Sequence, residues 1–266
     1  MRNRSPHNPT TLARRWTTLA RRTGLAVRTL LEHDGHPILA ITSPAWDRDE
    51  PGGVYLSAGI HGDEPAGTEG LLAWAEAEGR TLRKLPLLIL PCLNPWGLQE
   101  NSRRDRSGRD LNRAWNTPAH PLVRAVKSLL DGRCVRLALT LHEDYDGQGF
   151  YLYEPTRFRP PNVWAERILK QVAPILPPDP RKRIDGRLTT APGIIRRYLV
   201  SPSRLAPEPE ALYLHYHVAE RTFTFETPSE FALGVRVATQ VAAIRAALQG
   251  VASASVPMPR ISKRGV

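Results

Sequence analysis

Buried strand-like runs that end in polar residues constrain the fold of this chain more than any other feature of its sequence. Four mainly apolar runs, with helix-like stretches between them, lie at residues 54–59, 85–90, 135–141 and 222–225. Strands that alternate with helices favour a parallel or mixed sheet, in which ligands bind outside the carboxyl ends of the strands. The polar residues that follow the runs should therefore meet at one edge of the sheet. They are His61, Asn94, His142 and Glu226.

The turn after the first run carries a pair of possible metal ligands. His61 and Glu64 stand three residues apart, before a helix expected from Pro65 to about Ala77. A catalytic zinc site commonly takes two His and one Glu from the protein and keeps an open position for water. The turn would supply two of these ligands, and His142 is the natural third.

A general base is the next requirement of such a site. Zinc lowers the pKa of its bound water and polarises a carbonyl, and a base must stand within reach of that water. Glu226 comes from a different strand end and can face the open side of the metal. Glu143 and Asp144, beside His142, compete for this role, and Glu226 could instead cap the helix that follows it.

A long polar segment from Gly97 to Asn116 supplies positive charge. Segments of this length without structure of their own are usually functional or disordered. Arginine binds carboxylates through paired hydrogen bonds and stabilises a developing oxyanion. A solvated basic surface is the alternative, and it is the interpretation we favour for Arg104, Arg106 and Arg109.

Taken in order, these residues resemble a known family, from about Tyr55 to Pro228. The chain is similar to the zinc metallocarboxypeptidases of the M14 (carboxypeptidase A-like) type, near the bacterial murein-peptide amidases and the aspartoacylase/succinylglutamate desuccinylase branch. The resemblance rests on five pieces in family order: His61-x-x-Glu64; Asn94-Pro95-x-Gly97 with Arg103 nine residues after Asn94; Asp110-Leu111-Asn112-Arg113; His142; and Glu226-Thr227-Pro228.

The resemblance implies a role for each matching residue. One zinc ion per chain would be held by the metal ligands, which are His61, Glu64 and His142. Glu226 would activate the water and pass its proton to the leaving nitrogen, and Arg103 would hold the oxyanion. Asn112 and Arg113 would grip the free carboxylate of the substrate.

The sequence departs from the family pattern at two positions. Asp105 stands where many members have Asn, and Thr140 stands where many have an Asp behind the second His. The carboxylate that supports this His would then come from elsewhere in the chain. No motif places a catalytic Tyr, although Tyr213 and Tyr216 lie in the region before Glu226.

The fold implied by the resemblance is a single α/β domain with a mixed, roughly eight-stranded sheet and helices on both faces. We expect a basic helical segment at 1–24, the catalytic domain at 25–250 and a flexible tail at 251–266. Outside the four runs, the pattern predicts a hairpin over 25–42 and helices at 10–23, 121–130, 163–175 and 229–248. We expect no regular structure in two segments, 45–53 and 177–209.

The expected function is hydrolysis of an amide bond next to a free carboxylate in a small peptide, with a cell-wall peptide as one candidate. An N-acyl amino acid deacylase of the aspartoacylase/succinylglutamate desuccinylase kind is the alternative, which the compact spacing from Glu64 to His142 keeps open. A third possibility is an inactive scaffold that binds nucleic acid, suggested only by the net charge of +11. The arginines that produce this charge are scattered rather than striped, so nucleic acid is not the expected partner.

The sequence also bears on the compartment. No apolar run approaches the ~18 residues of a membrane span, and there is no apolar core of a signal peptide. Cys92 and Cys134 make no disulfide framework. We therefore expect a cytoplasmic protein without a membrane partner, although the Arg-rich N-terminus leaves an organelle transit peptide open.

Overall fold

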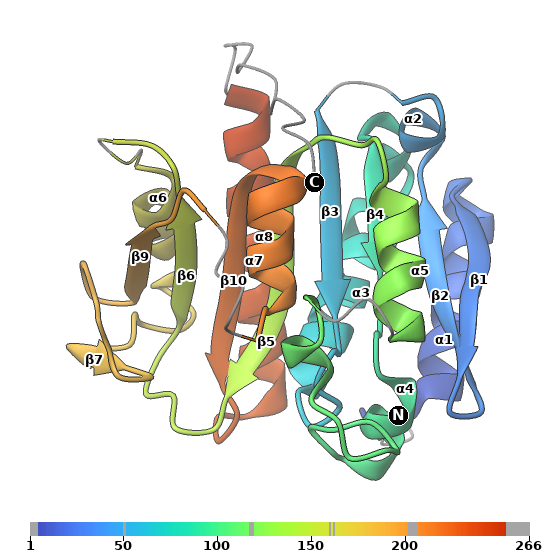
Figure 1. The fold of residues 1–266 in the computed structure, drawn as a ribbon, viewed down its shortest axis with the longest axis horizontal. Coiled ribbons are helices and arrows are strands. Elements are labelled where there is room, and N and C mark those ends of the chain that lie inside the picture. The colour runs from blue at the N-terminus through green and yellow to red at the C-terminus, as the bar shows by residue number, and fades with distance from the viewer. Residues whose placement is uncertain are drawn as a thin grey trace.

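One mixed sheet of eight strands forms the centre of the molecule (Figure 1). The computed structural model describes residues 5–49, 52–116, 120–159, 161, 163–201 and 207–253. In spatial order the strands are β1 (Ala26–His33), β2 (His36–Thr42), β4 (Leu87–Leu90), β3 (Gly53–Ala58), β5 (Val135–Asp144), β10 (Ala219–Pro228), β6 (Tyr151–Thr156) and β9 (Ile194–Tyr198). The expected α/β fold with a mixed sheet of about eight strands is confirmed.

Helices cover both faces of this sheet, as expected. Behind the sheet in Figure 1 lie α1 (Pro9–Thr23), α3 (Pro65–Glu78), α6 (Trp164–Val172) and α8 (Leu233–Ser253). In front of it lie α5 (Pro121–Leu130) and α7 (Glu210–His217). The shorter elements are α2 (Pro44–Asp47), α4 (Pro95–Glu100), the 3₁₀ turns η1 (Gly79–Lys84) and η2 (Leu111–Arg113), and the strand pair β7 (Arg183–Ile184) and β8 (Arg187–Leu188).

Each helical layer buries its own apolar cluster against the sheet. The rear cluster includes Trp16 from α1, Trp74 from α3 and Ile244 from α8. The front cluster includes Val126 from α5 and Leu214 from α7. Because both faces are covered, β3 is buried at every residue, which explains why its sequence is a nearly continuous apolar run.

The four central strands β4, β3, β5 and β10 run parallel to one another. Their carboxyl ends therefore reach the same edge of the sheet, at the bottom of Figure 1. The next strand, β6, is antiparallel to β10 and so begins at that edge. This edge is where the four polar residues that follow the predicted strands come together.

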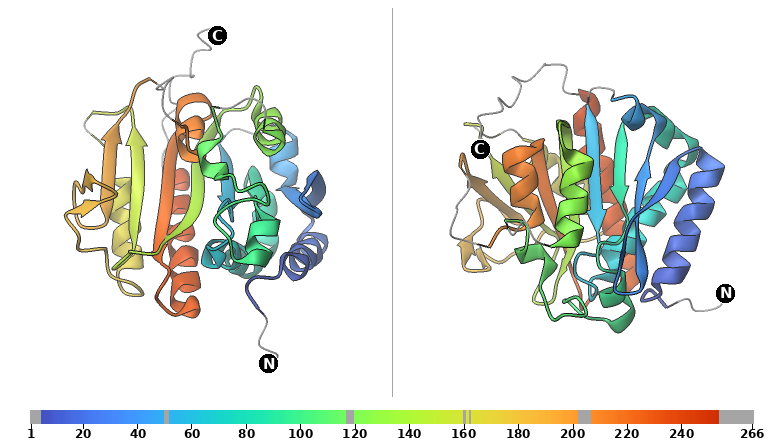
Figure 2. Two further views of the ribbon diagram at one scale, coloured as in Figure 1. Left: turned by 60° about the horizontal axis from the view of Figure 1, so that its bottom comes forward. Right: turned by 45° about the vertical axis from the view of Figure 1, so that its right-hand side comes forward.

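Local sequence explains the first elements of the chain. Asn8 caps α1 by accepting a hydrogen bond from the Thr11 amide at 2.8 Å, and the helix ends at Gly24 with a φ of +73°. Asp34 and Gly35 both have positive φ and close the predicted hairpin between β1 and β2. The view on the right of Figure 2 shows α1 beside this hairpin.

The two segments expected to lack regular structure contain some, and so does the long polar segment. The segment 45–53 includes most of α2, and the polar segment after Asn94 includes α4 and η2. The segment 177–209 contains β9, which pairs with β6 as the edge strand of the sheet. Most of the expected tail, residues 254–266, lies outside the described residues. None of the described helices combines the length and apolar character that a membrane span needs.

Candidate metal centre

The turn between β3 and α3 carries His61 and Glu64 to the carboxyl edge of the sheet. A Cβ atom at Gly62 would lie 1.9 Å from the carbonyl carbon of Gly97, so no side chain fits where this turn meets α4. The Gly62 amide also donates a hydrogen bond to the Ser102 carbonyl at 2.9 Å. The glycine between the two candidate ligands therefore lets the turn pack against the long polar segment 97–116, which is called the arginine-rich segment below.

Glu64 lies between two imidazoles. The Nδ1 atom of His61 is 2.6 Å from Oε1 of Glu64, and the Nδ1 atom of His142 is 2.8 Å from Oε2. One ligand atom from each of the three residues lies within 4.8 Å of the others, and all three residues are buried. The structure thus brings the three predicted metal ligands together.

The three side chains shift one another's pKa values strongly. Burial alone would lower the pKa of His61, but the Glu64 and Asp110 carboxylates together outweigh burial and raise it to about 9. Burial also opposes the charge on His142, yet Glu64 raises the pKa of this residue too. The two imidazoles hold the pKa of Glu64 well below its usual range despite its burial. The group therefore brings one negative and two potential positive charges together in a buried position.

The Nδ1 atom of His61 faces two partners with opposite demands. Glu64 needs a proton on this nitrogen, whereas Nη1 of Arg103, 3.2 Å away, needs its lone pair. A cation among the three side chains removes the conflict because it takes the lone pair and balances the carboxylate. Two imidazoles and one carboxylate are also a set that zinc takes in catalytic sites. The residues present therefore fit a zinc ion.

Asp110 supports this group from behind, and sequence reasoning gave it no role of its own. Its Oδ1 atom lies 3.2 Å from Nε2 of His61, and its Oδ2 atom lies 3.2 Å from Nε and Nη2 of Arg103. A histidine that binds a metal usually donates its other N–H to a carboxylate, which fixes the ring and its tautomer. Asp110 can do this for His61 while it holds the Arg103 guanidinium beside the same ligands.

Glu226 stands next to His142 because β10 and β5 pair in parallel with these two residues opposite each other. Burial raises the pKa of Glu226 well above its usual value, the nearby Glu64 and Asp144 add to this effect, and His142 opposes it. A higher pKa makes the carboxylate a stronger proton acceptor once it is ionised.

The two carboxylates that competed with Glu226 are engaged elsewhere. Glu143 accepts a hydrogen bond from the Ala66 amide at 2.6 Å and forms an ion pair with Arg236. Asp144 forms an ion pair with Arg181 at 2.9 Å. Glu143 thus stabilises the start of α3. Of the three candidates, Glu226 is the one that forms no ion pair within the described residues.

Asn112 and Arg113 approach the same group from η2. The Oδ1 atom of Asn112 accepts a hydrogen bond from the Glu210 amide at 2.9 Å, which leaves its NH₂ group to donate elsewhere. Arg113 donates to the Asn112 carbonyl at 3.0 Å through Nη1. Both residues therefore keep donors for an anionic group of a ligand.

A cavity of about 540 Å³ opens in front of these side chains. It is lined by all seven residues that the sequence assigned to the site: His61, Glu64, Arg103, Asn112, Arg113, His142 and Glu226. Asn94 is not among the lining residues; its side chain caps α4 by accepting from the Gly97 amide at 2.9 Å. Of these seven, His61, His142 and Glu226 are the residues that the strand pattern placed at the carboxyl edge, and Glu64 lies in the turn that follows His61.

Sequence reasoning missed the far wall of this cavity. Tyr213 and Tyr216 do not line it, whereas Tyr151 and Tyr153 do. Their hydroxyls donate to Asp144 at 3.0 Å and to Asp185 at 2.6 Å, respectively. Further lining residues come from the segment once expected to be irregular, namely Arg187, Ile195, Arg197 and Leu199. Tyr151 and Tyr153 could have been predicted from β6, because this antiparallel strand begins at the site edge.

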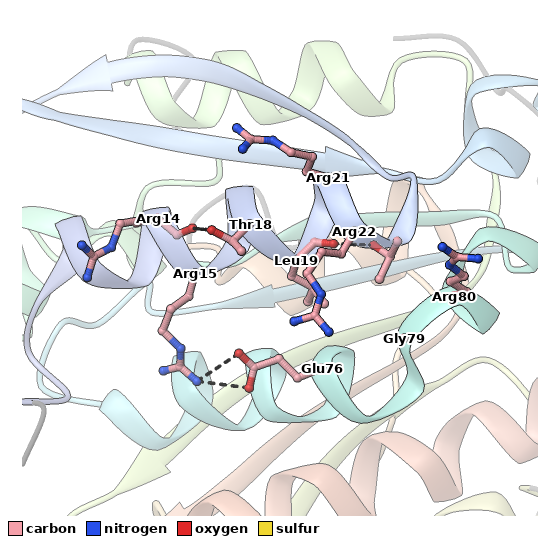
Figure 3. A pocket seen from close by; sticks show the side chains of 10 residues that line it. Arg14, Arg15, Thr18, Leu19, Arg21, Arg22, Glu76, Gly79 and Arg80 are labelled. Carbon is pink, nitrogen blue, oxygen red and sulfur yellow. Dashed lines mark hydrogen bonds and ion pairs between the residues drawn. The ribbon is translucent and has the colours of Figure 1, made fainter. Parts of the chain in front are cut away.

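A second hollow, of about 940 Å³, lies between α1 and α3 and has a different character (Figure 3). Arg15 reaches across it to Glu76 with an ion pair of 3.2 Å, and the remaining charged side chains around it are arginines. Its lining includes Arg14, Arg21, Arg22 and Arg80. These lining residues include no His or Cys, so the hollow lacks the ligand set found in the smaller cavity.

Comparisons with known proteins agree with this description. Residues 52–149 match the family model of the succinylglutamate desuccinylase/aspartoacylase catalytic domain. Over 107 residues, or 36% of the chain, the sequence is 32% identical to Carboxypeptidase 2 of Trichophyton tonsurans. That segment spans only 19% of the length of the fungal protein. The resemblance inferred from the sequence motifs is confirmed.

Solved structures share the whole fold. A protein of Shewanella denitrificans OS217, provisionally assigned as a metallopeptidase, superposes with a TM-score of 0.80 at 21% identity, over 95% of this chain and 99% of that one. A metallo-carboxypeptidase of Burkholderia cenocepacia gives a TM-score of 0.68 at 16% identity, over 90% and 68% of the two chains. At these identities the likeness establishes the fold, which is that of the metallocarboxypeptidases.

Proposed function

We propose that this chain is a zinc-dependent metallocarboxypeptidase, which hydrolyses an amide bond next to a free carboxylate in a small peptide. The observation that carries the proposal is the meeting of His61, Glu64 and His142 within 4.8 Å, with Glu226 lining the same cavity. The fold shared with metallocarboxypeptidases supports it.

The metal would be held by the two Nδ1 atoms of His61 and His142 and by the Glu64 carboxylate. When bound, zinc supplies Lewis acidity, which polarises a carbonyl and acidifies water. Asp110 holds the opposite nitrogen of His61, Nε2, and would so leave Nδ1 available to the metal. The burial of the three ligands strengthens every electrostatic interaction between them.

Glu226 and Arg103 act on the reacting amide. Glu226 takes a proton from the attacking water and delivers it to the nitrogen of the leaving group, so that the carboxylate returns to its starting state. The Arg103 guanidinium, 43% exposed and held by Asp110, offers N–H donors to the oxygen that gains negative charge. Because Arg103 is anchored beside His61, its donors lie close to the metal ligands before any substrate arrives.

Asn112 and Arg113 select the substrate. Both residues line the cavity, and their remaining donors would bind the terminal carboxylate of a peptide through charge-assisted hydrogen bonds. The scissile amide would then lie between the bound carboxylate and the side chain of Glu226. A cell-wall peptide is one substrate that such a site accommodates.

The alternative is an N-acyl amino acid deacylase. It is considered because residues 52–149 match the desuccinylase/aspartoacylase domain. Both reactions need the same ligands, base and carboxylate-binding groups. They differ in the fragment that is released, which is an amino acid in one case and an acyl group in the other.

The experiment that decides is a product analysis with zinc-loaded protein. A free-acid dipeptide, a murein tripeptide and a set of N-acyl amino acids are incubated in parallel, and mass spectrometry identifies the products. Release of a C-terminal amino acid supports the peptidase, and release of an acyl group supports the deacylase. If none of these substrates is cleaved although zinc occupies the site, the proposed hydrolase is wrong.

A further inference from the structure

A second group of potential metal ligands lies outside the cavity. His33 at the end of β1, Asp105 in the segment after α4, and His120 just before α5 each offer one ligand atom, and these atoms lie within 4.8 Å of one another. The rings of His33 and His120 have their centroids 5.4 Å apart and are inclined by 75°. None of the three residues lines the cavity of the candidate metal centre.

Two nitrogens of this group are buried without a hydrogen-bond partner in the described part of the chain: Nε2 of His33 and Nδ1 of His120. His120 is only 3% exposed. Buried polar groups nearly always have a partner, and leaving one unpaired costs about 1–3 kcal/mol. Nε2 of His33 has only an ion-pair contact of 3.6 Å with Oδ2 of Asp34. Imidazole nitrogens without a hydrogen bond, in a group of two imidazoles and one carboxylate, are available to a metal ion.

Asp105 is held firmly by one oxygen and turns the other toward His120. Its Oδ1 atom accepts hydrogen bonds from the Ser107 hydroxyl at 2.7 Å and from the Arg109 amide at 2.8 Å. Its Oδ2 atom lies 3.6 Å from Nε2 of His120, which is too far for a hydrogen bond. A carboxylate whose first oxygen is fixed by the backbone can present its second oxygen to a cation without further ordering.

We propose that His33, Asp105 and His120 form a second metal site, which binds a divalent transition-metal ion such as zinc. Two imidazoles and one carboxylate are ligands that zinc and its neighbours in the first transition row prefer. Around a tetrahedral zinc ion with bonds of about 2.0–2.1 Å, ligand atoms stand about 3.3 Å apart, so the three side chains would draw closer together on binding. The His33 side chain is 18% exposed and gives the ion a route from solvent.

This ion would position the arginine-rich segment. The three ligands come from the β1–β2 hairpin, from the segment between α4 and η2, and from the start of α5. The hairpin already touches the segment, because Oδ2 of Asp34 accepts a hydrogen bond from the Arg106 amide at 3.2 Å. Arg103 and Asp110, which belong to the candidate metal centre, lie on either side of Asp105 in the same segment. The second ion is therefore structural, and it anchors the segment that carries Arg103 and Asp110 to the ligands of the first.

Metal stoichiometry of the full chain tests the proposal. Metal-free protein is brought to equilibrium with zinc by dialysis, and zinc per chain is measured by mass spectrometry of the elements. We expect two zinc ions in the unaltered protein and one in Asp105→Asn, which keeps the hydrogen bonds to Oδ1 and so preserves the segment. His33→Gln should also bind one. His36→Gln is the matched control on the same hairpin, outside the ligand group, and should bind two.

The outcomes separate this site from the proposed function. His142→Ala should lose one ion and keep the other, and that other ion should disappear when Asp105→Asn is added. A single zinc ion in the unaltered protein that survives Asp105→Asn and is lost with His142→Ala would overturn the second site and leave the proposed function standing. An ion lost only with Asp105→Asn would support the second site and contradict the first.

Discussion

Glu226 and His142 lie directly opposite each other in the parallel pairing of β10 with β5. Opposite residues of paired strands project to the same face of the sheet. The proposed base is thus tied to a proposed metal ligand through the hydrogen-bond ladder of two buried strands, and a slip of one residue would turn Glu226 to the other face. This register explains how a base and a ligand separated by 84 positions in the chain can hold a fixed distance.

The first prediction concerns Glu226. Glu226→Gln should lower kcat for the cleaved substrate about 10³-fold, because general acid–base catalysis typically contributes 10²–10⁴ and an amide cannot take the proton. Zinc content should stay unchanged, since Glu226 is not one of the three ligands. Steady-state kinetics with metal analysis of the same sample measures both. Glu220→Gln on the same strand is the control, and equal loss in the two variants would argue against a catalytic role.

Arg113 should determine the preference for a free carboxylate. Arg113→Ala should reduce kcat/KM for a free-acid peptide about 10–100-fold, because hydrogen bonds to charged groups contribute about 1.5–3 kcal/mol. The same peptide with an amidated C-terminus should react slowly in both proteins. Arg106→Ala, an exposed arginine of the same segment, should behave like the unaltered protein. An unchanged ratio between free-acid and amidated substrates in Arg113→Ala would remove Arg113 from substrate recognition.

Asp110 should act through His61 rather than on the substrate. Asp110→Asn should weaken zinc binding at the candidate centre about 10–100-fold, as is typical when the carboxylate behind a metal-bound histidine is lost. Competition with a chelator of known affinity measures this change. Saturating zinc should restore activity. The recovery should be complete only if the Arg103 guanidinium keeps its position without the Asp110 carboxylate. Asp146→Asn, an exposed residue near the cavity, is the control and should leave the zinc affinity unaltered.

The N-terminal helix should be part of the folded unit. Trp16 is fully buried in the rear cluster, so Trp16→Ala should lower the free energy of unfolding by about 3–5 kcal/mol. Arg21→Ala on the exposed side of α1 should have little effect. Urea unfolding followed by circular dichroism compares them. If Trp16→Ala unfolded at the same urea concentration as the unaltered protein, residues 1–24 would be the separate segment that the sequence alone suggested.

Much of the site could be predicted because buried parallel strands have a recognisable sequence pattern. A nearly continuous apolar run such as 54–59 indicates a strand covered on both faces, and the residue after it must lie at the sheet edge. Parallel neighbours place their ends at the same edge, so His142 and Glu226 followed from the same reasoning. The spacing of His61 and Glu64 added two ligand types that a single metal can use.

The remaining parts depended on contacts that local sequence does not encode. Asp110 meets His61 across 49 positions only because the arginine-rich segment folds back over the β3–α3 turn. β9 was missed since its residues after Ile195 are two arginines and a tyrosine, which lack the apolar character of the central strands. It is an edge strand paired on one side only, so its sequence need not be apolar. The arginines of the cavity wall were missed together with it.

Zinc anomalous diffraction from crystals grown with zinc tests the central claim most directly, because it locates the metal independently of any substrate. We predict a peak about 2.0–2.2 Å from Nδ1 of His61, from Nδ1 of His142 and from an oxygen of Glu64. The direct contacts of 2.6 and 2.8 Å between Glu64 and the two imidazoles should be replaced by these bonds. A map with no peak among these three residues, while both contacts persist at saturating zinc, would contradict the account.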